Sequence, residues 1–300
     1  MIANFTFAGK WQPGIAPVAV VMISLNEGHN MEALLQNLSG WAQEVFLVDS
    51  HSADETVEVA LRYGVSVVQR PFHGFGDQWN FALQELPINA PWTMKLDPDE
   101  RLTSELKQTI FDCVSRKLCT GITFSRRLWF MGNPLPIKQD ILRVWKTGKC
   151  KFSDVLVNEH PLVDGNIVHV DGELEHHDSP CLHHWYDKQN KYSTLEALSV
   201  FRKSKFSDSP VFWGSALQRR MWIKKYFNKI PFRFYLVFIY YFIFLSLWKN
   251  GKVGYIWSRL RADVYRMREY KLYEMLVTGK ELPMLASGIG NPDLRVKQYY

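Results

Sequence analysis

Short apolar runs alternate with helix-like segments over the first 117 residues, and this pattern limits the chain to a few folds. The apolar runs lie at 18–24, 44–49, 65–68 and 93–96. A continuous apolar run indicates a strand that is buried on both faces of a sheet. Segments with helical spacing follow the runs at 30–38, 52–63, 77–86 and 103–117. Ser52 and Glu55 have the spacing of a capping box, which predicts the start of the second of these helices. The sequence therefore predicts an α/β fold, a mostly parallel sheet with helices on both faces.

Polar side chains stand at the ends of three of these predicted strands. Asn26 follows the first strand, Asp49 ends the second and Asp97 follows the fourth. Ligands of open α/β sheets bind beyond the carboxyl ends of the strands. We therefore expect these three residues to lie at a ligand site.

The segment Lys95–Leu102 contains the strongest single indication of chemistry. Asp97 and Asp99 are two residues apart, and like charges this close repel each other unless a cation lies between them. A hard divalent ion such as Mg²⁺ or Mn²⁺ binds carboxylate oxygens and keeps open positions for substrate phosphates. Pro98 biases Asp97 towards an extended conformation. An isolated pair of this kind is more often a solvated acidic turn, so other features must support a metal site.

The pattern changes twice after residue 117. Strand-like runs at 121–130, 141–145 and 167–170 predict a mixed sheet, and the chain is helical beyond Trp185. We expect an N-terminal extension at 1–16, an α/β domain carrying the site at 17–205 and a helical region at 206–300. The N-terminal residues lack a basic segment followed by a long apolar one, so we expect no secretory signal.

An uncharged and almost wholly apolar run occupies residues 234–248, with basic residues on both sides. A helix of about 15 residues spans roughly 22 Å, which is short of the roughly 30 Å hydrocarbon core of a bilayer. Trp and Tyr flank the run, as they do at membrane interfaces. We therefore favour a helix or re-entrant hairpin seated in one leaflet over a simple transmembrane span and over a helix in the protein core.

The formal net charge is +6, and between Arg202 and Arg233 many basic residues face a single acid, Asp208. Such a stripe can bind nucleic acid, an anionic lipid surface or a phosphorylated substrate. Because the stripe adjoins lipid-like apolar sequence, we rank a nucleic-acid-binding module last and expect a membrane surface as a partner. The four cysteines form no CxxC pair, which fits a reducing compartment.

Three motifs in order resemble those of a known family. Ser24–Asn30 follows an apolar strand, Val48–Thr56 reads VDSHSADET, and Lys95–Glu100 reads KLDPDE. Together they resemble the motifs of family 2 glycosyltransferases with the GT-A fold, in particular the branch that includes lipopolysaccharide inner-core glycosyltransferases. The likeness covers residues 17–200. His51 departs from the family by replacing a customary glycine, so the turn after Asp49 could differ in shape, and Pro98 replaces an alanine.

The resemblance implies roles for residues of the nucleotide-sugar site. Asp49 would contact the nucleotide base, with an N-cap or Asx-turn as the alternative, and Asp97 would lie near the ribose and the metal. Asp99 would ligate Mg²⁺ or Mn²⁺ at the diphosphate, where charge grows as the glycosidic bond breaks. Further residues expected at the nucleotide sugar are Asn26, Glu27, Arg70, Gln78 and Asn80.

An inverting transfer also needs a general base for the acceptor hydroxyl proton. Glu159 matches the family's acidic catalytic residue, Asp154 is the reserve, and a plain surface role is the alternative for Glu159.

Histidines and arginines supply further candidates. One of His176 or His177 is a candidate contact for the metal or the diphosphate, and we take His177 as the candidate metal ligand. A structural zinc site at these residues and at His183–His184 is disfavoured, because adjacent residues on a strand point to opposite faces. Other basic residues could bind an anionic acceptor or face solvent, namely Arg126, Arg127 and Arg143.

We expect a metal-dependent, inverting glycosyltransferase that uses a nucleotide sugar, and we expect this donor to be a UDP-sugar. Its acceptor would be a membrane-bound glycolipid, lipopolysaccharide or polysaccharide precursor, met at the cytoplasmic face of the inner membrane of a bacterium. One alternative is a non-catalytic sugar-nucleotide-binding protein of the same fold. Another is a sugar nucleotidyltransferase, which would release pyrophosphate instead of a nucleoside diphosphate.

Overall fold

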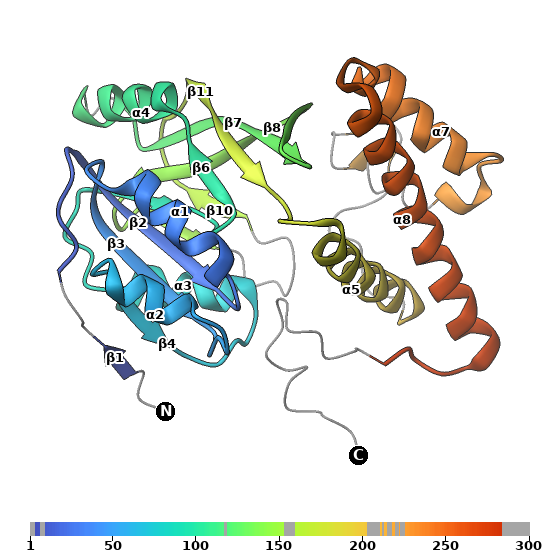
Figure 1. Ribbon diagram of the computed structural model, residues 1–300, viewed down its shortest axis with the longest axis horizontal. Helices are drawn as coiled ribbons and strands as arrows, with labels where there is room; N and C mark the ends of the chain where they lie inside the picture. The colour runs from blue at the N-terminus through green and yellow to red at the C-terminus, as the bar shows by residue number, and fades with distance from the viewer. Residues whose placement is uncertain are drawn as a thin grey trace. The chain divides into compact units, whose positions relative to one another are not determined.

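The computed structural model describes residues 4–6, 10–116, 119–152, 160–202 and 226–283, together with 211, 213–214, 218–219 and 222. These residues form two compact units, one within 1–178 and the other within 179–285 (Figure 1). The units divide between Asp178 and Ser179, so α5 (Leu182–Phe201) belongs to the second unit, although we placed a domain boundary at 205. The predicted N-terminal extension contributes β1 (Asn4–Thr6), which pairs with a strand of the first unit.

The first unit is built on one large sheet, in which the described strands follow the order β1-β4-β3-β2-β5-β8-β7-β11-β6. Its parallel part is made by the four strands that the apolar runs predict. These are β2 (Ala16–Ser24), β3 (Ala42–Asp49), β4 (Ser66–Gln69) and β5 (Trp92–Lys95). Sheet order places β3 and β5 on either side of β2, so the carboxyl ends of all four strands meet at one edge.

The remaining strands form the predicted mixed part of the sheet. β8 (Asn133–Lys146) lies antiparallel between β5 and β7 (Gly121–Phe130). β11 (Ile167–His177) runs parallel to β7, and β6 (Glu100–Leu102) pairs antiparallel with β11. The strand predicted at 167–170 therefore continues to His177, and both histidines of the pair lie on it. A separate small sheet joins β9 (Cys150–Phe152) to β10 (Pro161–Val163).

Helices cover both faces of the parallel strands, as predicted (Figure 1). Val18, Val20 and Met22 of β2 pack in one buried cluster with side chains of α1 (Gly28–Leu38), α2 (Thr56–Arg62) and α4 (Ser104–Arg116). Ala19 and Val21 lie in a second cluster with α3 (Phe75–Glu85). Successive strand residues point to opposite faces. Burial of both faces therefore explains why the run is apolar at every position.

Gly172 interrupts β11 and allows its last residues to lie beside β6. Its φ is +100°, and a Cβ atom there would lie 2.6 Å from the backbone of Leu106 in α4. The register of β11 with β7 shifts between His169 and Glu173, as at a β-bulge. Beyond this bulge His176 stands opposite Glu100. A glycine is needed here because other residues rarely adopt this φ and would collide with α4.

The second unit is helical. Besides α5 it contains η1 (Phe227–Lys229), α7 (Arg233–Ile239), the π-helical turn η2 (Tyr240–Phe244), η3 (Leu247–Asn250) and α8 (Gly251–Thr278). Ala197 and Leu198 of α5 pack on Met275 of α8. The Lys271 ammonium donates to the main-chain oxygen of Asn190 at 2.6 Å and to the Thr194 hydroxyl at 2.8 Å. Apolar packing and these hydrogen bonds together join the two helices.

The apolar run at 234–248, for which we expected a helix or a re-entrant hairpin, is broken. The segment passes from α-helix to π-helix and then turns at Ser246, whose φ is +59°. Among the described helices no single one has the length and hydropathy of a membrane span, although 233–244 and 247–278 meet that test as a pair bent by 74°. α7 and η2 contain no buried residue, which argues against the core-helix alternative. Five residues of the predicted basic stripe lie outside the described residues, namely Lys203, Lys205, Arg220, Lys224 and Lys225.

Candidate functional site

Asp49 lies fully buried at the end of β3 and holds the ends of neighbouring segments together. Its Oδ1 accepts a hydrogen bond from the Ser24 hydroxyl at 2.9 Å and another from the Ser52 hydroxyl. Its Oδ2 accepts from the Ser52 main-chain N–H at 2.8 Å and from the Gln69 amide at 2.9 Å. A carboxylate has about four acceptor positions, and these four donors fill them. These contacts give Asp49 a structural role in the local turn, and a contact with a nucleotide base stays a prediction.

Asn26 and Glu27 lie on the loop after β2, next to the turn that Asp49 organises. The main-chain N–H of Asn26 donates to the Ser52 hydroxyl at 2.8 Å, and its side-chain oxygen accepts from the N–H of Ala53 at 2.8 Å. Asn26 has a φ of +57°, a left-handed conformation that asparagine tolerates better than most residues. Glu27 accepts from the Asn30 amide at 2.8 Å. The structure thus brings all three predicted base-site residues into two adjoining loops.

The capping box predicted at Ser52 and Glu55 is not formed. α2 begins at Thr56, and the side chain of its N-cap residue, Glu55, makes no capping hydrogen bond. The Ser52 hydroxyl instead bonds to Asp49 and Asn26, as described above. Asp54 accepts from the main-chain N–H groups of Gly28 and Thr56 at 3.0 and 3.1 Å. Local sequence predicted a helix start, but contacts with the loop after β2 use the same polar atoms.

His51 keeps the turn shape that a glycine would adopt most easily. Its φ is +60°, in the left-handed region, and the residue is exposed. The histidine at this position therefore strains the backbone but does not change the shape of the turn. Left-handed backbone costs roughly 1–2 kcal/mol for residues other than glycine.

We expect His51→Gly to raise the free energy of unfolding by about 0.5–1 kcal/mol, because relief of strain exceeds the extra freedom of glycine in the unfolded chain. His51→Val should lower it, since β-branched side chains fit this conformation least well. Urea denaturation of the two variants and the parent measures the difference. Equal stability of the glycine and valine variants would contradict the strain.

Arg70, Gln78 and Asn80, the weaker nucleotide candidates, all have partners within the protein. Arg70 pairs with the Asp77 carboxylate at 2.7 Å. Asn80 donates to the main-chain oxygen of Phe152 at 3.1 Å and accepts from its N–H at 2.8 Å, so it holds α3 to β9. Gln78 is fully buried and donates to the Ser50 hydroxyl at 3.2 Å. Its Oε1 atom has no hydrogen-bond partner among the described residues, which makes Gln78 the one of the three with an acceptor unused.

A buried ion network lies behind the acidic turn after β5. Arg143 of β8 donates to Asp97 Oδ2 at 2.7 Å and to Glu100 Oε1 at 2.8 Å. Glu100 is fully buried and also accepts from Arg126 at 3.2 Å and from the N–H of Asp97 at 3.0 Å. Arg127 contacts Glu173 at 3.2 Å instead. Each of the three arginines that we considered for an anionic acceptor therefore pairs with a carboxylate of the protein.

The charge state of Asp97 follows from this network. Burial favours the neutral acid, but Arg143 and Lys95 outweigh it and hold the pKa of Asp97 at about 2. Burial likewise opposes the charge of Arg143, yet Asp97 and Glu100 raise its pKa. The Asp97 side chain is still one-third exposed, at 33%. Asp97 is therefore an anion at neutral pH. Arg143 holds its carboxylate on the buried side, and part of the side chain is accessible to solvent.

We expect the stability that Asp97 contributes to disappear in strong acid. Its folded pKa of about 2 lies below the ordinary value of 3.8, so the contribution is complete above pH 3.8 and is lost as the pH falls through 2. Solvent screening at this partly exposed group limits the contribution to about 1 kcal/mol. Denaturation of the parent and Asp97→Asn in EDTA measures the difference, which should be constant above pH 4 and shrink towards pH 2. A pH-independent difference would contradict the ion pair.

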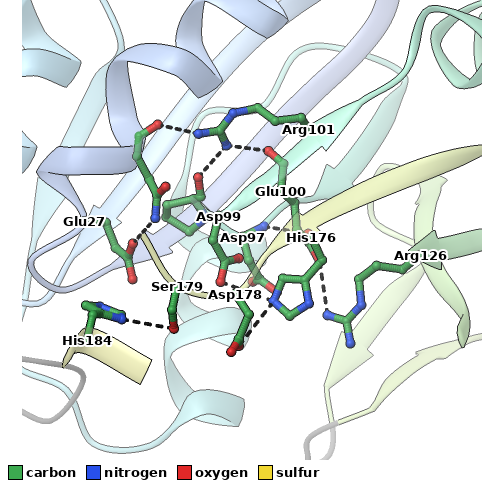
Figure 2. A network of polar contacts seen from close by, with 12 residues as sticks. Glu27, Asp97, Asp99, Glu100, Arg101, Arg126, His176, Asp178, Ser179 and His184 are labelled. Atoms are coloured by element: carbon green, nitrogen blue, oxygen red, sulfur yellow. Dashed lines mark hydrogen bonds and ion pairs between the residues drawn. The ribbon is translucent and has the colours of Figure 1, made fainter. Parts of the chain in front are cut away.

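Among the described residues, Asp99, His176 and Asp178 form a group that could hold a metal ion, with ligand atoms all within 4.8 Å of one another. His176 Nε2 lies 3.2 Å from Asp99 Oδ2 and 3.9 Å from Asp178 Oδ1. Figure 2 shows the imidazole beside both carboxylates, with Asp97 next to them. The N–H of His177 donates to the main-chain oxygen of Asp99 at 2.8 Å, which ties the end of β11 to the acidic turn.

The donor set fits a divalent ion of the kind expected. Carboxylate oxygens suit Mg²⁺ and Mn²⁺, and one imidazole nitrogen beside them favours Mn²⁺. Three protein ligands leave coordination positions for a substrate phosphate. Burial lowers the pKa of His176, but the charge of Asp99 outweighs burial and raises it. A proton and a metal ion would therefore compete for this imidazole.

The group differs from the predicted ligands in two members. Asp97 is paired with Arg143, and His177 points to Glu175 at 3.1 Å and packs on Trp129 with ring centroids 5.0 Å apart. Adjacent residues on β11 point to opposite sides, so only one histidine of the pair can face Asp99. Asp178 was not among our candidates. Its spacing of two from His176, which repeats one face of a strand, was the signal that could have identified it.

The predicted general base lies outside the described residues. This applies to Glu159 and to the reserve candidate Asp154, both within the segment 153–159. Their roles stay predictions.

Residues 19–152 match the model of the family described as glycosyl transferase family 2. The chain carries a family 2 glycosyltransferase domain. The match includes the loops of Asn26 and Asp49 and the acidic turn at Asp97 and Asp99. The α/β unit with helices on both faces is the architecture that the resemblance to GT-A enzymes implied.

Named relatives of this glycosyltransferase agree with the family. The lipopolysaccharide core biosynthesis glycosyltransferase LpsC of Rhizobium meliloti is 25% identical over 270 residues, which cover 86% of this chain and 92% of LpsC. An uncharacterized glycosyltransferase of Rickettsia bellii is 34% identical over 93 residues, or 31% of each chain. The mannosyltransferase PcManGT of Pyrobaculum calidifontis, solved with GDP-Man and Mn²⁺, is 15% identical at a TM-score of 0.47 and covers 88% of this chain and 90% of its own.

Proposed function

We propose that this glycosyltransferase moves a sugar from a nucleotide sugar, with a UDP-sugar as donor, to a hydroxyl group with inversion at the anomeric carbon. The observation that supports this most is the group of Asp99, His176 and Asp178 at the end of the sheet, beside the ionised Asp97. A bound Mn²⁺ or Mg²⁺ would neutralise the charge that develops on the departing diphosphate. A nucleoside diphosphate is the leaving group that such a site suits.

The residues around the metal group keep the donor site rigid. Arg143 fixes the Oδ2 atom of Asp97, and Glu100 accepts from the Asp97 N–H, so both ends of this residue are held. The partly exposed carboxylate can then accept hydrogen bonds from a ribose hydroxyl without reorganising. Asp99 and His176 are held by the pairing of β11 with β6. Preorganised groups of this kind act without a cost of rearrangement during the reaction.

The nucleotide base would bind at the loops of Asn26, Glu27 and Asp49. A site that pairs the polar edge of a base discriminates strongly against bases that lack the matching groups. The buried Asp49 would reach the base only if Ser52 or Gln69 gave up its hydrogen bond. Glu159, with Asp154 in reserve, would take the proton of the acceptor hydroxyl.

The acceptor we propose is a membrane-bound lipopolysaccharide, glycolipid or polysaccharide precursor. The name of LpsC, whose length the alignment covers to 92%, supports a lipopolysaccharide core acceptor. The enzyme would then work at the cytoplasmic face of the inner membrane of a bacterium, as a peripheral or monotopic protein. The uncharged apolar segment 234–248 with its basic flanks supports this location.

A screen of nucleotide sugars for release of the nucleotide, with and without Mn²⁺, tests the reaction. We expect one UDP-sugar to yield UDP only when Mn²⁺ is present, and Glu159→Gln to bind that donor but transfer its sugar at least 10²-fold more slowly. Nuclear magnetic resonance of the product gives the anomeric configuration. Release of pyrophosphate would favour the nucleotidyltransferase, and tight binding without turnover of any donor would favour the non-catalytic alternative.

A further inference from the structure

The segment Phe232–Phe244 presents an unusually apolar surface in the second unit. Phe232 is 78% exposed and Phe244 is 74% exposed. The stretch from Phe234 to Trp248 contains no charged side chain. Exposed apolar patches of this kind on a folded protein mark surfaces that bind a partner.

The exposed side chains lie on one side of the segment. Pairs of exposed residues alternate with pairs of half-buried ones, from Phe232 through to Phe244. The half-buried Phe238 and Phe242 pack on Tyr255 of α8, with ring centroids 5.7 and 6.0 Å apart. We call the opposite side the outward face, and it consists of Phe232, Tyr235, Leu236, Ile239, Tyr240, Ile243 and Phe244.

The π-helical turn keeps this face in line. A repeat of four residues drifts around an α-helix, which has 3.6 residues per turn. The turn at Tyr240–Phe244 is wider, with i→i+5 hydrogen bonds, and it shifts the later residues back. The outward face therefore continues straight from α7 into η2.

Basic residues flank the outward face in the sequence, and Asp and Glu are absent from the same stretch. From Tyr226 to Ala262 the sequence contains no Asp or Glu. The exposed Lys229 lies before the segment, and exposed Lys249, Lys252 and Arg259 lie after it. Arg233 is instead neutralised by the Glu269 carboxylate. A stretch of this composition suits an anionic surface, and each Lys or Arg near an anionic bilayer adds to binding.

An aromatic side chain at the end of the segment is of a kind that prefers a bilayer interface. Trp248, which follows the segment, is 55% exposed. Trp and Tyr are enriched at the level of lipid headgroups. A cavity of about 210 Å³, which Leu236 and Tyr240 help to line, gives the surface a recess next to the outward face.

We propose that the outward face lies in the plane of an anionic phospholipid bilayer and inserts its apolar side chains into one leaflet. The basic residues at both ends contact the headgroups. This deepens the proposed membrane location, and rests on it, by naming the element and the lipid charge. A helix of about 12 residues is roughly 18 Å long, which is too short to cross a bilayer. The 74° bend after residue 244 turns α8 away from the axis of this segment. The segment therefore lies in one leaflet and does not span the bilayer.

Cosedimentation of the full chain with vesicles tests the proposal. We expect binding to vesicles of phosphatidylcholine with phosphatidylglycerol, and at least about tenfold weaker binding to phosphatidylcholine alone. The double variant Ile243→Asn/Phe244→Asn should reduce the partition coefficient at least about tenfold, because two apolar side chains would no longer enter the leaflet. Lys249→Glu/Lys252→Glu should reduce binding to the anionic vesicles.

A matched control removes exposed apolar side chains elsewhere in the same unit. Leu276 is 63% exposed and Val277 is 66% exposed near the end of α8. Leu276→Asn/Val277→Asn should bind anionic vesicles as the parent does. Equal loss in both double variants, or none in either, would overturn the proposal.

Two further readouts separate this inference from the proposed reaction and from self-association. Hydrolysis of the nucleotide-sugar donor in solution should be the same in Ile243→Asn/Phe244→Asn and the parent. Donor hydrolysis without vesicle binding would refute the inference alone, and vesicle binding without hydrolysis would refute the reaction alone. Size-exclusion chromatography tests whether the face instead binds a second copy of the chain. If the parent were a dimer, Ile243→Asn/Phe244→Asn a monomer, and neither bound vesicles, the outward face would be a dimer interface.

Discussion

Asp99→Asn should lower kcat/KM for sugar transfer by about 10²–10³-fold at a Mn²⁺ concentration that saturates the parent. Asparagine keeps the shape of the side chain but removes the charge that binds a divalent ion. Asp99 supplies one of the three ligand atoms that lie within 4.8 Å of one another. Its carboxylate also contacts the imidazole of His176. UDP release, followed over a Mn²⁺ titration, measures both the rate and the apparent metal affinity. EDTA should abolish the parent's activity, and Mn²⁺ should restore it.

The adjacent histidines supply a matched control for this site. His176→Ala removes a member of the group and should weaken the apparent Mn²⁺ affinity at least about tenfold. His177→Ala removes a side chain that contacts Glu175 and Trp129, and should leave that affinity near the parent value. Asp178→Asn should resemble His176→Ala. If His177→Ala instead gave the larger loss, the ligand set would be the one predicted from the sequence and not the one in the structure.

Arg143→Met should lower the free energy of unfolding by about 3–5 kcal/mol. Arg143 is buried, and it is the shared partner of Asp97 and of the fully buried Glu100. Its removal leaves two carboxylates without their closest cation, and only Glu100 retains another arginine, Arg126 at 3.2 Å. Loss of one member of a buried ion network exposes the full cost of the charges left behind. Chemical denaturation followed by circular dichroism measures the change.

Two variants distinguish a buried network from a general need for arginine in this sheet. Arg127→Met removes the neighbouring arginine of β7, whose partner Glu173 is partly exposed and also contacts Lys138, so the loss should be below about 1 kcal/mol. Adding Glu100→Gln to Arg143→Met should recover part of the stability, because the uncompensated charge disappears. Similar losses for Arg127→Met and Arg143→Met would contradict the importance of the buried charges.

The parallel part of the fold could be predicted from the sequence because its signals are local. An apolar run such as Val18–Ser24 is long enough to indicate a strand buried on both faces, and Val20 and Val21 indeed lie in different core clusters. The helices that follow carry their own apolar spacing. Asn26, Asp49 and Asp97 were expected near one edge of the sheet because parallel strands end together. The acidic pair and the family motifs consist of residues that are close together in the sequence. The sequence alone therefore identifies them.

Predictions that depended on local pattern alone failed where distant contacts compete for the same atoms. The Ser52 hydroxyl was expected to cap a helix, but Asp49 and Asn26 use it. For the apolar run at 234–248 the local pattern left a helix and a re-entrant hairpin open, and only the structure shows the π-helical turn and the break at Ser246. Arg143 was assigned to an acceptor or to solvent, because nothing near it in sequence indicates Asp97 or Glu100. A pattern reports the preference of a segment and not the partner that it meets.

The amino-acid sequence by itself determined the α/β unit, the acidic turn at its edge and the apolar, basic-flanked segment near the C-terminus. Tertiary structure alone decided which side chains complete the candidate metal group. The bulge at Gly172 and the pairing of β11 with β6 set His176, rather than His177, against Asp99, across 77 positions of the chain. The physical reason is that strand register is set by hydrogen bonds between distant segments, and a shift of one residue turns every side chain to the other face.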